Sequence, residues 1–189
     1  MYKFEAKPVH PIGYDYTDMI AMLPLNTRWS DVSWRNDACN SVRATVAGIG
    51  EYTVWFNYLN PSDREIPGAH QFMVTFGDDM ESVISSNDLD EVRVALLDDL
   101  EERWRDSATY FDDLNANSIG LDFALTTVPT PGYAFADGSY IIVNREPVLT
   151  YNVIIGNVEQ VYHAADERGE AWEDAVDCLW QNHSRDNYI

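Results

Sequence analysis

Acidic side chains at helical spacing are the feature of this sequence with the clearest chemical meaning. The stretch from Asp78 to Asp113 holds 13 carboxylates and three arginines. Five of these carboxylates, separated by 7, 4, 4 and 7 residues, are Glu91, Asp98, Glu102, Asp106 and Asp113. In an α-helix this spacing places them on one side, with a rise of about 6 Å per four-residue step. The pattern predicts a row of negative charges broadly similar to successive phosphates of a nucleic-acid strand.

A second segment, near the C-terminus, is also rich in carboxylates, and we expect both segments to contact a partner. A solvated helix face usually interleaves Lys or Arg, whereas like charges at i, i+4 destabilise a helix by a few tenths of a kcal/mol. Their retention suggests that the electric field itself is used. The predicted partner-binding residues are Glu91, Asp98, Asp99, Glu101, Glu102, Asp106, Asp112, Asp113, Glu170, Glu173, Asp174 and Asp177.

The net charge of the whole chain narrows the classes of partner. It is −20 at pH 7, so the surface repels nucleic acid and anionic membranes and attracts proteins that normally hold nucleic acid. The leading hypothesis is a non-enzymatic inhibitor, a small acidic mimic of nucleic acid that occupies the positively charged DNA- or RNA-binding surface of a host defence complex. Anti-CRISPR and anti-restriction proteins of phages and mobile elements have this physical profile. A two-fold homodimer would double the anionic surface.

Salt adaptation is the main alternative explanation of the acidity. Lys3 and Lys7 are the only lysines of the chain, and an acidic, lysine-poor composition suits a cytoplasm in which concentrated cations screen the carboxylates. The alternative function is then a soluble α+β enzyme or ligand-binding protein of a halophilic proteome. A phage structural or adaptor protein is the third class.

Motifs for catalysis or metal binding are weak. His163 and Glu167 form an i, i+4 pair that Glu170 and Asp174 extend, but the chain has no ExxH sequence of the di-iron type. It also has no GxSxG motif for a nucleophilic serine. We therefore expect no catalytic residue, no cofactor and no metal. Cys39 and Cys178 belong to no CxxC pair, so two buried thiols are expected rather than a disulfide or a zinc site.

Apolar periodicity predicts the helices that carry the charges. Steps of three and four residues predict a long amphipathic helix over about 88–114, with the apolar stripe Leu89, Val92, Leu96, Leu100, Trp104, Ala108, Phe111 and Leu114. A second helix is expected over about 157–183, where Gly169 is a candidate break. The N-terminal portion is also expected to be helical, over residues 14–24 and from Asn26 or Thr27 through Val42.

The remaining segments predict strands, so the fold class is α+β. Residues 52–59 and 71–76 are expected to pair antiparallel, because β-branched and aromatic residues are dense in both. Residues 121–128, 133–135, 140–144 and 148–155 suit a meander. We expect a single domain over 1–189, with residues 1–50 as a candidate helical lobe. No run of about 18 apolar residues occurs, which favours a cytoplasmic protein without a membrane span.

Overall fold

The computed structural model describes residues 17–25, 29–33, 37, 39–111, 131–145, 148–155, 158–165, 167–185 and 188. The chain divides into two compact units. The first unit contains residues 1–46 and 50–100, and the second contains residues 47–49 and 101–188. Each unit has a five-stranded antiparallel sheet and helical segments, so the α+β class is confirmed.

The sheet of the first unit is a meander in which neighbouring strands follow one another in sequence. Helix α1 (Thr17–Met22) precedes it, and the 3-10 turn η1 (Pro61–Asp63) lies between its third and fourth strands. Its strands are β1 (Ser30–Asp31), β2 (Asn40–Val46), β3 (Gly50–Phe56), β4 (Phe72–Phe76) and β5 (Glu81–Ser86). All four strand pairs are antiparallel.

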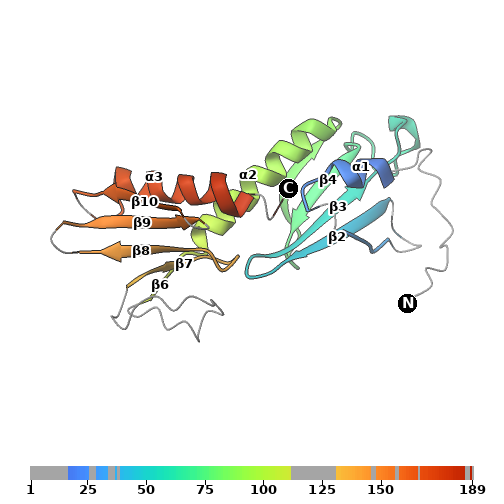
Figure 1. Ribbon diagram of the computed structural model, residues 1–189. Coiled ribbons are helices and arrows are strands. Elements are labelled where there is room, and N and C mark those ends of the chain that lie inside the picture. Colours follow the sequence, from blue (N-terminus) through green and yellow to red (C-terminus); the bar gives the residue numbers. More distant parts are fainter. Residues whose placement is uncertain are drawn as a thin grey trace. The chain divides into compact units, whose positions relative to one another are not determined.

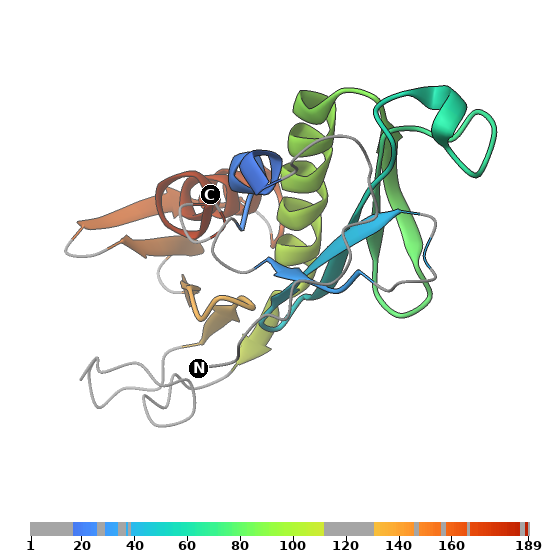
Figure 2. The same cartoon turned by 90° about the vertical axis from the view of Figure 1, so that its right-hand side faces the viewer.

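Helix α2 (Leu89–Asp106) follows this sheet, and its apolar residues complete the core of the first unit. Val92, Leu96 and Leu100 have no exposed surface. Tyr52 and Val54 of β3 are equally buried, and side chains two apart on a strand point to the same face. Figure 2 shows α2 along one side of these strands. The helix therefore covers one face of the sheet.

The second unit also contains a sequential meander, covered by a C-terminal helix. Helix α3 (Glu170–Leu179) continues into a π-helical turn, η2 (Trp180–Ser184), and packs on β9 and β10 (Figure 1). The strands are β6 (Thr109–Phe111), β7 (Gly132–Ala134), β8 (Tyr140–Asn144), β9 (Thr150–Ile155) and β10 (Val158–His163).

Aromatic rings dominate the core of the second unit. Trp104, from the last turns of α2, stacks on Phe135 with 4.2 Å between ring centroids and meets Trp180 at 5.1 Å. Trp172 of α3 contacts Tyr151 of β9 at 5.3 Å. Large rings bury much area each and favour such offset and tilted pairs. They fix the helical segments against the second sheet.

The predicted helix over 88–114 is too long at its C-terminal end. Helix α2 stops at Asp106, where Ser107 Oγ donates to the Trp104 carbonyl at 2.6 Å. Residues 109–111 form β6 instead and pair with β7. Phe111 packs against buried Tyr140 and Ile142. Thr, Tyr and Phe are good strand formers, so pairing with β7 overrides the helical spacing of Phe111.

The predicted helix over 157–183 is wrong in its first half. Residues 158–163 form β10, paired along its whole length with β9. Val158, Val161 and Tyr162 suit a strand, and the hairpin supplies the partner. Gly169 is the N-cap of α3 rather than a break within a longer helix. The residues after Leu179 turn with π-helical geometry.

The predicted helix from Asn26 or Thr27 through Val42 is wrong where the structure describes it, at residues 29–33, 37 and 39–42. Helix α1 covers Thr17–Met22, but the later residues form β1 and β2. In β2, Val42, Ala44 and Val46 are buried at alternate positions, which is the period of a strand and not of a helix. Residues 1–16 lie outside the described part of the chain.

The predicted pair of 52–59 and 71–76 corresponds to β3 and β4, and its antiparallel pairing is confirmed. The predicted strands at 133–135, 140–144 and 148–155 correspond to β7, β8 and β9. The predicted strand at 121–128 falls outside the described residues. The single-domain organisation stays a prediction. No helix among the residues described is long and apolar enough to cross a membrane.

Candidate protein-binding surface

Arg105 connects the last turns of α2 to α3 in the second unit. Its Nη2 donates to Glu101 Oε1 at 2.6 Å and also contacts Asp177 Oδ1, while Nη1 lies 3.5 Å from Glu173 Oε2. Burial alone would lower the pKa of Arg105, but hydrogen bonds and charge from Asp177 and Glu101 outweigh it and raise the pKa. One guanidinium therefore holds carboxylates from both helices together.

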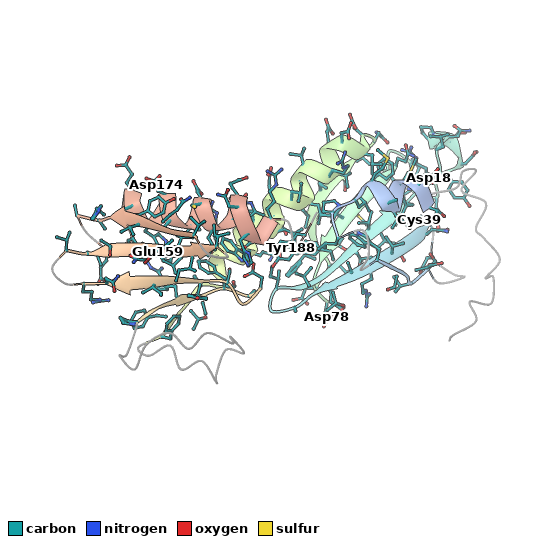
Figure 3. The ribbon with its side chains drawn as sticks, viewed as in Figure 1. Asp18, Cys39, Asp78, Glu159, Asp174 and Tyr188 are labelled. Carbon is teal, nitrogen blue, oxygen red and sulfur yellow. The ribbon has the colours of Figure 1, made fainter. Side chains whose placement is uncertain are left out.

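Further carboxylates lie on the same two helical segments and are not bonded to Arg105. Glu102 and Asp106 are exposed and four residues apart on α2, and Glu170 and Asp174 are exposed at the same spacing on α3. Asp174 projects from α3 in Figure 3. We call the whole set the acidic helical surface: Glu101, Glu102, Asp106, Glu170, Glu173, Asp174 and Asp177. Seven predicted partner-binding residues therefore lie on two adjacent helical segments of one unit.

A hollow of about 330 Å³ opens beside the acidic helical surface. Arg105, Asp106 and Glu173 line it together with Trp172 and Arg168. It combines an aromatic ring with charged groups of both signs, which is typical of the anchoring centre of a protein interface. The spacing of acidic residues gives no sign of this hollow, because its walls come from two segments that are 60 or more residues apart in sequence.

Arg168 has an unusual place at the edge of this hollow. Its backbone has a φ of 54°, in the left-handed region. Its guanidinium lies 4.9 Å from the centre of the Tyr133 ring and 5.4 Å from that of Trp172, within the range of cation–π attraction. Tyr110 adds an exposed ring 5.3 Å from Tyr133. The sequence analysis missed this aromatic and cationic border.

The predicted site residues in the first unit have mixed roles. Asp98 is exposed on α2. Asp99 is half-buried and accepts a hydrogen bond from the Tyr52 hydroxyl at 2.6 Å. Glu91 accepts one from Ser86 at 2.5 Å, near the start of the helix. Asp99 and Glu91 therefore contribute to the fold of the first unit, and Asp98 is the more available for a partner.

Asp112 and Asp113 fall outside the described residues, so their predicted role stays a prediction. No group of three or more His, Cys, Asp or Glu side chains that would hold a metal ion occurs in the described part of the chain. His163, Glu170 and Asp174 do line a second hollow between β10 and α3. Comparisons with protein-family models, curated proteins and solved structures found no match to this chain.

Proposed function

We propose that this protein is a non-enzymatic inhibitor that mimics nucleic acid. Its acidic helical surface would occupy the positively charged DNA- or RNA-binding surface of a host defence complex of the CRISPR or restriction type. The observation that carries the proposal is the Arg105 contact, which joins acidic residues of α2 and α3 into one surface. Electrostatic complementarity of this kind accelerates association and selects basic partners.

The charge balance of this surface supports a cationic partner. Seven carboxylates lie on it, and Arg105 is shared among three of them. Glu102, Asp106, Glu170 and Asp174 are exposed, so an arginine-rich groove would replace their hydration with direct contacts. Charge-assisted pairs between arginine and carboxylate are short and often bidentate. The aromatic border at Tyr110 and Tyr133 would add apolar contact at the edge.

A competition experiment tests the proposal. Purified restriction enzymes and CRISPR effectors are each mixed with labelled target DNA and increasing amounts of the protein, and DNA binding and cleavage are measured. We expect the protein to displace DNA from at least one of these enzymes, with an affinity that falls as salt rises. The same enzyme should protect cells from phage less well when the protein is expressed.

Matched variants separate the surface from the total charge. The test variant carries Glu102→Gln, Asp106→Asn, Glu170→Gln and Asp174→Asn, all outside the Arg105 contact. The control variant removes the same charge from the first unit, with Asp18→Asn, Asp63→Asn, Asp78→Asn and Asp79→Asn, all at exposed positions. We expect the test variant to lose about tenfold or more in inhibition and the control to lose little. Equal losses would rule out a specific surface.

A further inference from the structure

The first unit contains an open cavity of about 530 Å³ that the acidic surface does not use. Ligand sites of small molecules fall in the range of roughly 300–1,000 Å³. Trp55 and Met73 form part of its wall and are directly paired across β3 and β4. Tyr52 and Val54, at even positions of β3, face α2, so Trp55 at an odd position faces away from the helix. The cavity therefore lies on the sheet face that α2 leaves uncovered.

The loop from residue 57 to 71 makes the other wall, and a buried arginine holds it in place. Arg64 is 8% exposed. Its Nε donates to the Tyr58 carbonyl at 2.8 Å, and its Nη atoms donate to the carbonyls of Ala69 at 2.5 Å and Leu59 at 3.3 Å. Asn87 Oδ1 accepts a further bond at 3.1 Å. Four bonds to one buried guanidinium give a wall that is formed before any ligand binds.

One side-chain amide of the cavity lining makes no hydrogen bond within the described part of the protein. Gln71 is 7% exposed and lines the cavity. Its backbone N–H donates to Asn87 Oδ1, and its carbonyl accepts from the Asn57 N–H. Its side-chain amide has no hydrogen-bond partner among the residues that the structure describes. In the described ranges, the fully buried side-chain atoms without a partner belong to Asn40, Trp104 and Asp137, so the Gln71 amide reaches the open cavity. The Gln71 amide is therefore available to a ligand.

The charged lining of the cavity is negative. Asp37, Glu65 and His70 line it, and the buried guanidinium of Arg64 lies behind the loop wall, so two carboxylates stand against one permanent cation. Burial, followed by the charges of Asp37 and Glu65, raises the pKa of the neighbouring Cys39 to about 11. Ile66 and Met80, which are 64% and 49% exposed, extend the apolar wall to the rim. An apolar cavity with a negative field favours an apolar ligand that carries positive charge.

We propose that this cavity binds a small organic cation, an amine or guanidine on an aromatic or branched aliphatic body. Trp55 and Met73 would contact the apolar body, and Trp55 would also attract the cation through its ring face. Glu65 and Asp37 would complement the charge, and the Gln71 amide would make a hydrogen bond. This site goes beyond the proposed function and does not depend on it, because the acidic helical surface belongs to the other unit.

A charge series with one apolar body tests the proposal. The full-length protein is titrated with phenethylamine, 2-phenylethanol and 3-phenylpropionate, by calorimetry and by saturation-transfer NMR of the ligands. We expect the amine to bind about tenfold more tightly than the neutral alcohol, and the carboxylate to show no binding. The proposal is overturned if none of the three binds at millimolar concentration, or if the alcohol or the carboxylate binds as tightly as the amine.

Variants then locate the binding. Glu65→Gln removes a carboxylate of the lining, and Asp63→Asn removes one from the same loop that does not line the cavity. We expect Glu65→Gln to weaken phenethylamine binding by about twofold to fivefold and Asp63→Asn to leave it unchanged. Trp55→Leu should weaken both the amine and the alcohol. If Glu65→Gln and Trp55→Leu bind the amine as the wild type does, the cavity is not the site.

Discussion

The hydroxyl of Tyr52 donates a hydrogen bond to Asp99 Oδ2 at 2.6 Å. Tyr52 belongs to the central strand β3 and has no exposed surface, and Asp99 lies on the side of α2 next to the sheet. A carboxylate that the sequence assigns to a partner thus ties a helix to its own sheet. Hydrogen bonds to a charged acceptor are among the stronger ones in proteins.

Replacing Tyr52 by Phe should therefore destabilise the first unit. The change removes the donor and leaves a half-buried carboxylate with one hydrogen bond fewer, so we expect a loss of about 1–3 kcal/mol in the free energy of unfolding. Urea denaturation followed by circular dichroism measures it. Tyr110→Phe, at an exposed ring, is the control and should change little. A Tyr52→Phe protein as stable as the wild type would show that the bond contributes nothing.

The Arg105 contact makes a second prediction, about the second unit. Arg105→Gln leaves Glu101, Glu173 and Asp177 facing one another without a cation. Because Arg105 and its partners are partly exposed, we expect a loss of about 1 kcal/mol in unfolding free energy, smaller at high salt. Urea titrations at low and high salt measure both effects.

Two further variants check the cause of that loss. Arg93→Gln breaks an exposed pair with Asp90 and should cost almost nothing, as is usual for surface ion pairs. Adding Glu173→Gln to Arg105→Gln should restore part of the stability, since it relieves repulsion between like charges. If Arg93→Gln and Arg105→Gln cost the same, the three-carboxylate contact has no special role.

The sequence predicts the parts of this fold in which local pattern and final packing agree. Val92, Leu96, Leu100 and Trp104 of the predicted apolar stripe are all fully buried. The prediction is wrong at Phe111. This residue continues the helical spacing from Trp104, but it belongs to strand β6. Which of the two is realised depends on pairing with β7, more than 20 residues later. Periodicity within one segment contains no information on that partner.

For the candidate surface, too, local spacing does not predict contacts between residues that are far apart in sequence. Spacing on α2 and α3 predicts which carboxylates share a helix side, but not that Arg105 contacts Asp177, 72 residues away. It also does not distinguish Asp99, which bonds to Tyr52, from exposed Asp98. The cavity beside Trp55 gave no sequence signal, because its lining comes from three strands and three connecting segments. The structure shows which residues that are far apart in sequence lie next to one another in space.

Asp137 makes a prediction about pH. Burial would raise its pKa, but hydrogen bonds from Ser139, together with the nearby polar groups of Ser184 and Trp104, outweigh burial and hold the pKa below its usual value. Ser139 Oγ donates to Asp137 Oδ1 at 2.5 Å. Trp104 Nε1 and Asp137 Oδ2 are both buried and neither has a hydrogen-bond partner of normal geometry. The carboxylate form is favoured in the folded state.

A depressed pKa stabilises the folded protein at neutral pH, and the contribution disappears in acid. It is fully present above the unfolded value near 3.9 and is lost as pH falls through the lower folded value. We expect the stability difference between wild type and Asp137→Asn to shrink between about pH 5 and pH 2. Urea midpoints of both proteins across this range measure it. A difference that does not change with pH would exclude linkage at Asp137.

Salt dependence distinguishes the proposed inhibitor from a salt-adapted protein. Both units have cores of fully buried residues, such as Leu96 and Val54 in the first and Trp104 and Val153 in the second. Apolar burial supplies most of the folding free energy and needs no cation.

We therefore expect the protein to be folded at about 50 mM salt, although added salt should raise its stability somewhat by screening the net charge of −20. Near-UV circular dichroism and the sedimentation coefficient, measured from low salt to molar KCl, test this. A chain that is unfolded at low salt and folds only in molar KCl would favour halophilic adaptation, because its carboxylates would then need bulk cations rather than a basic partner.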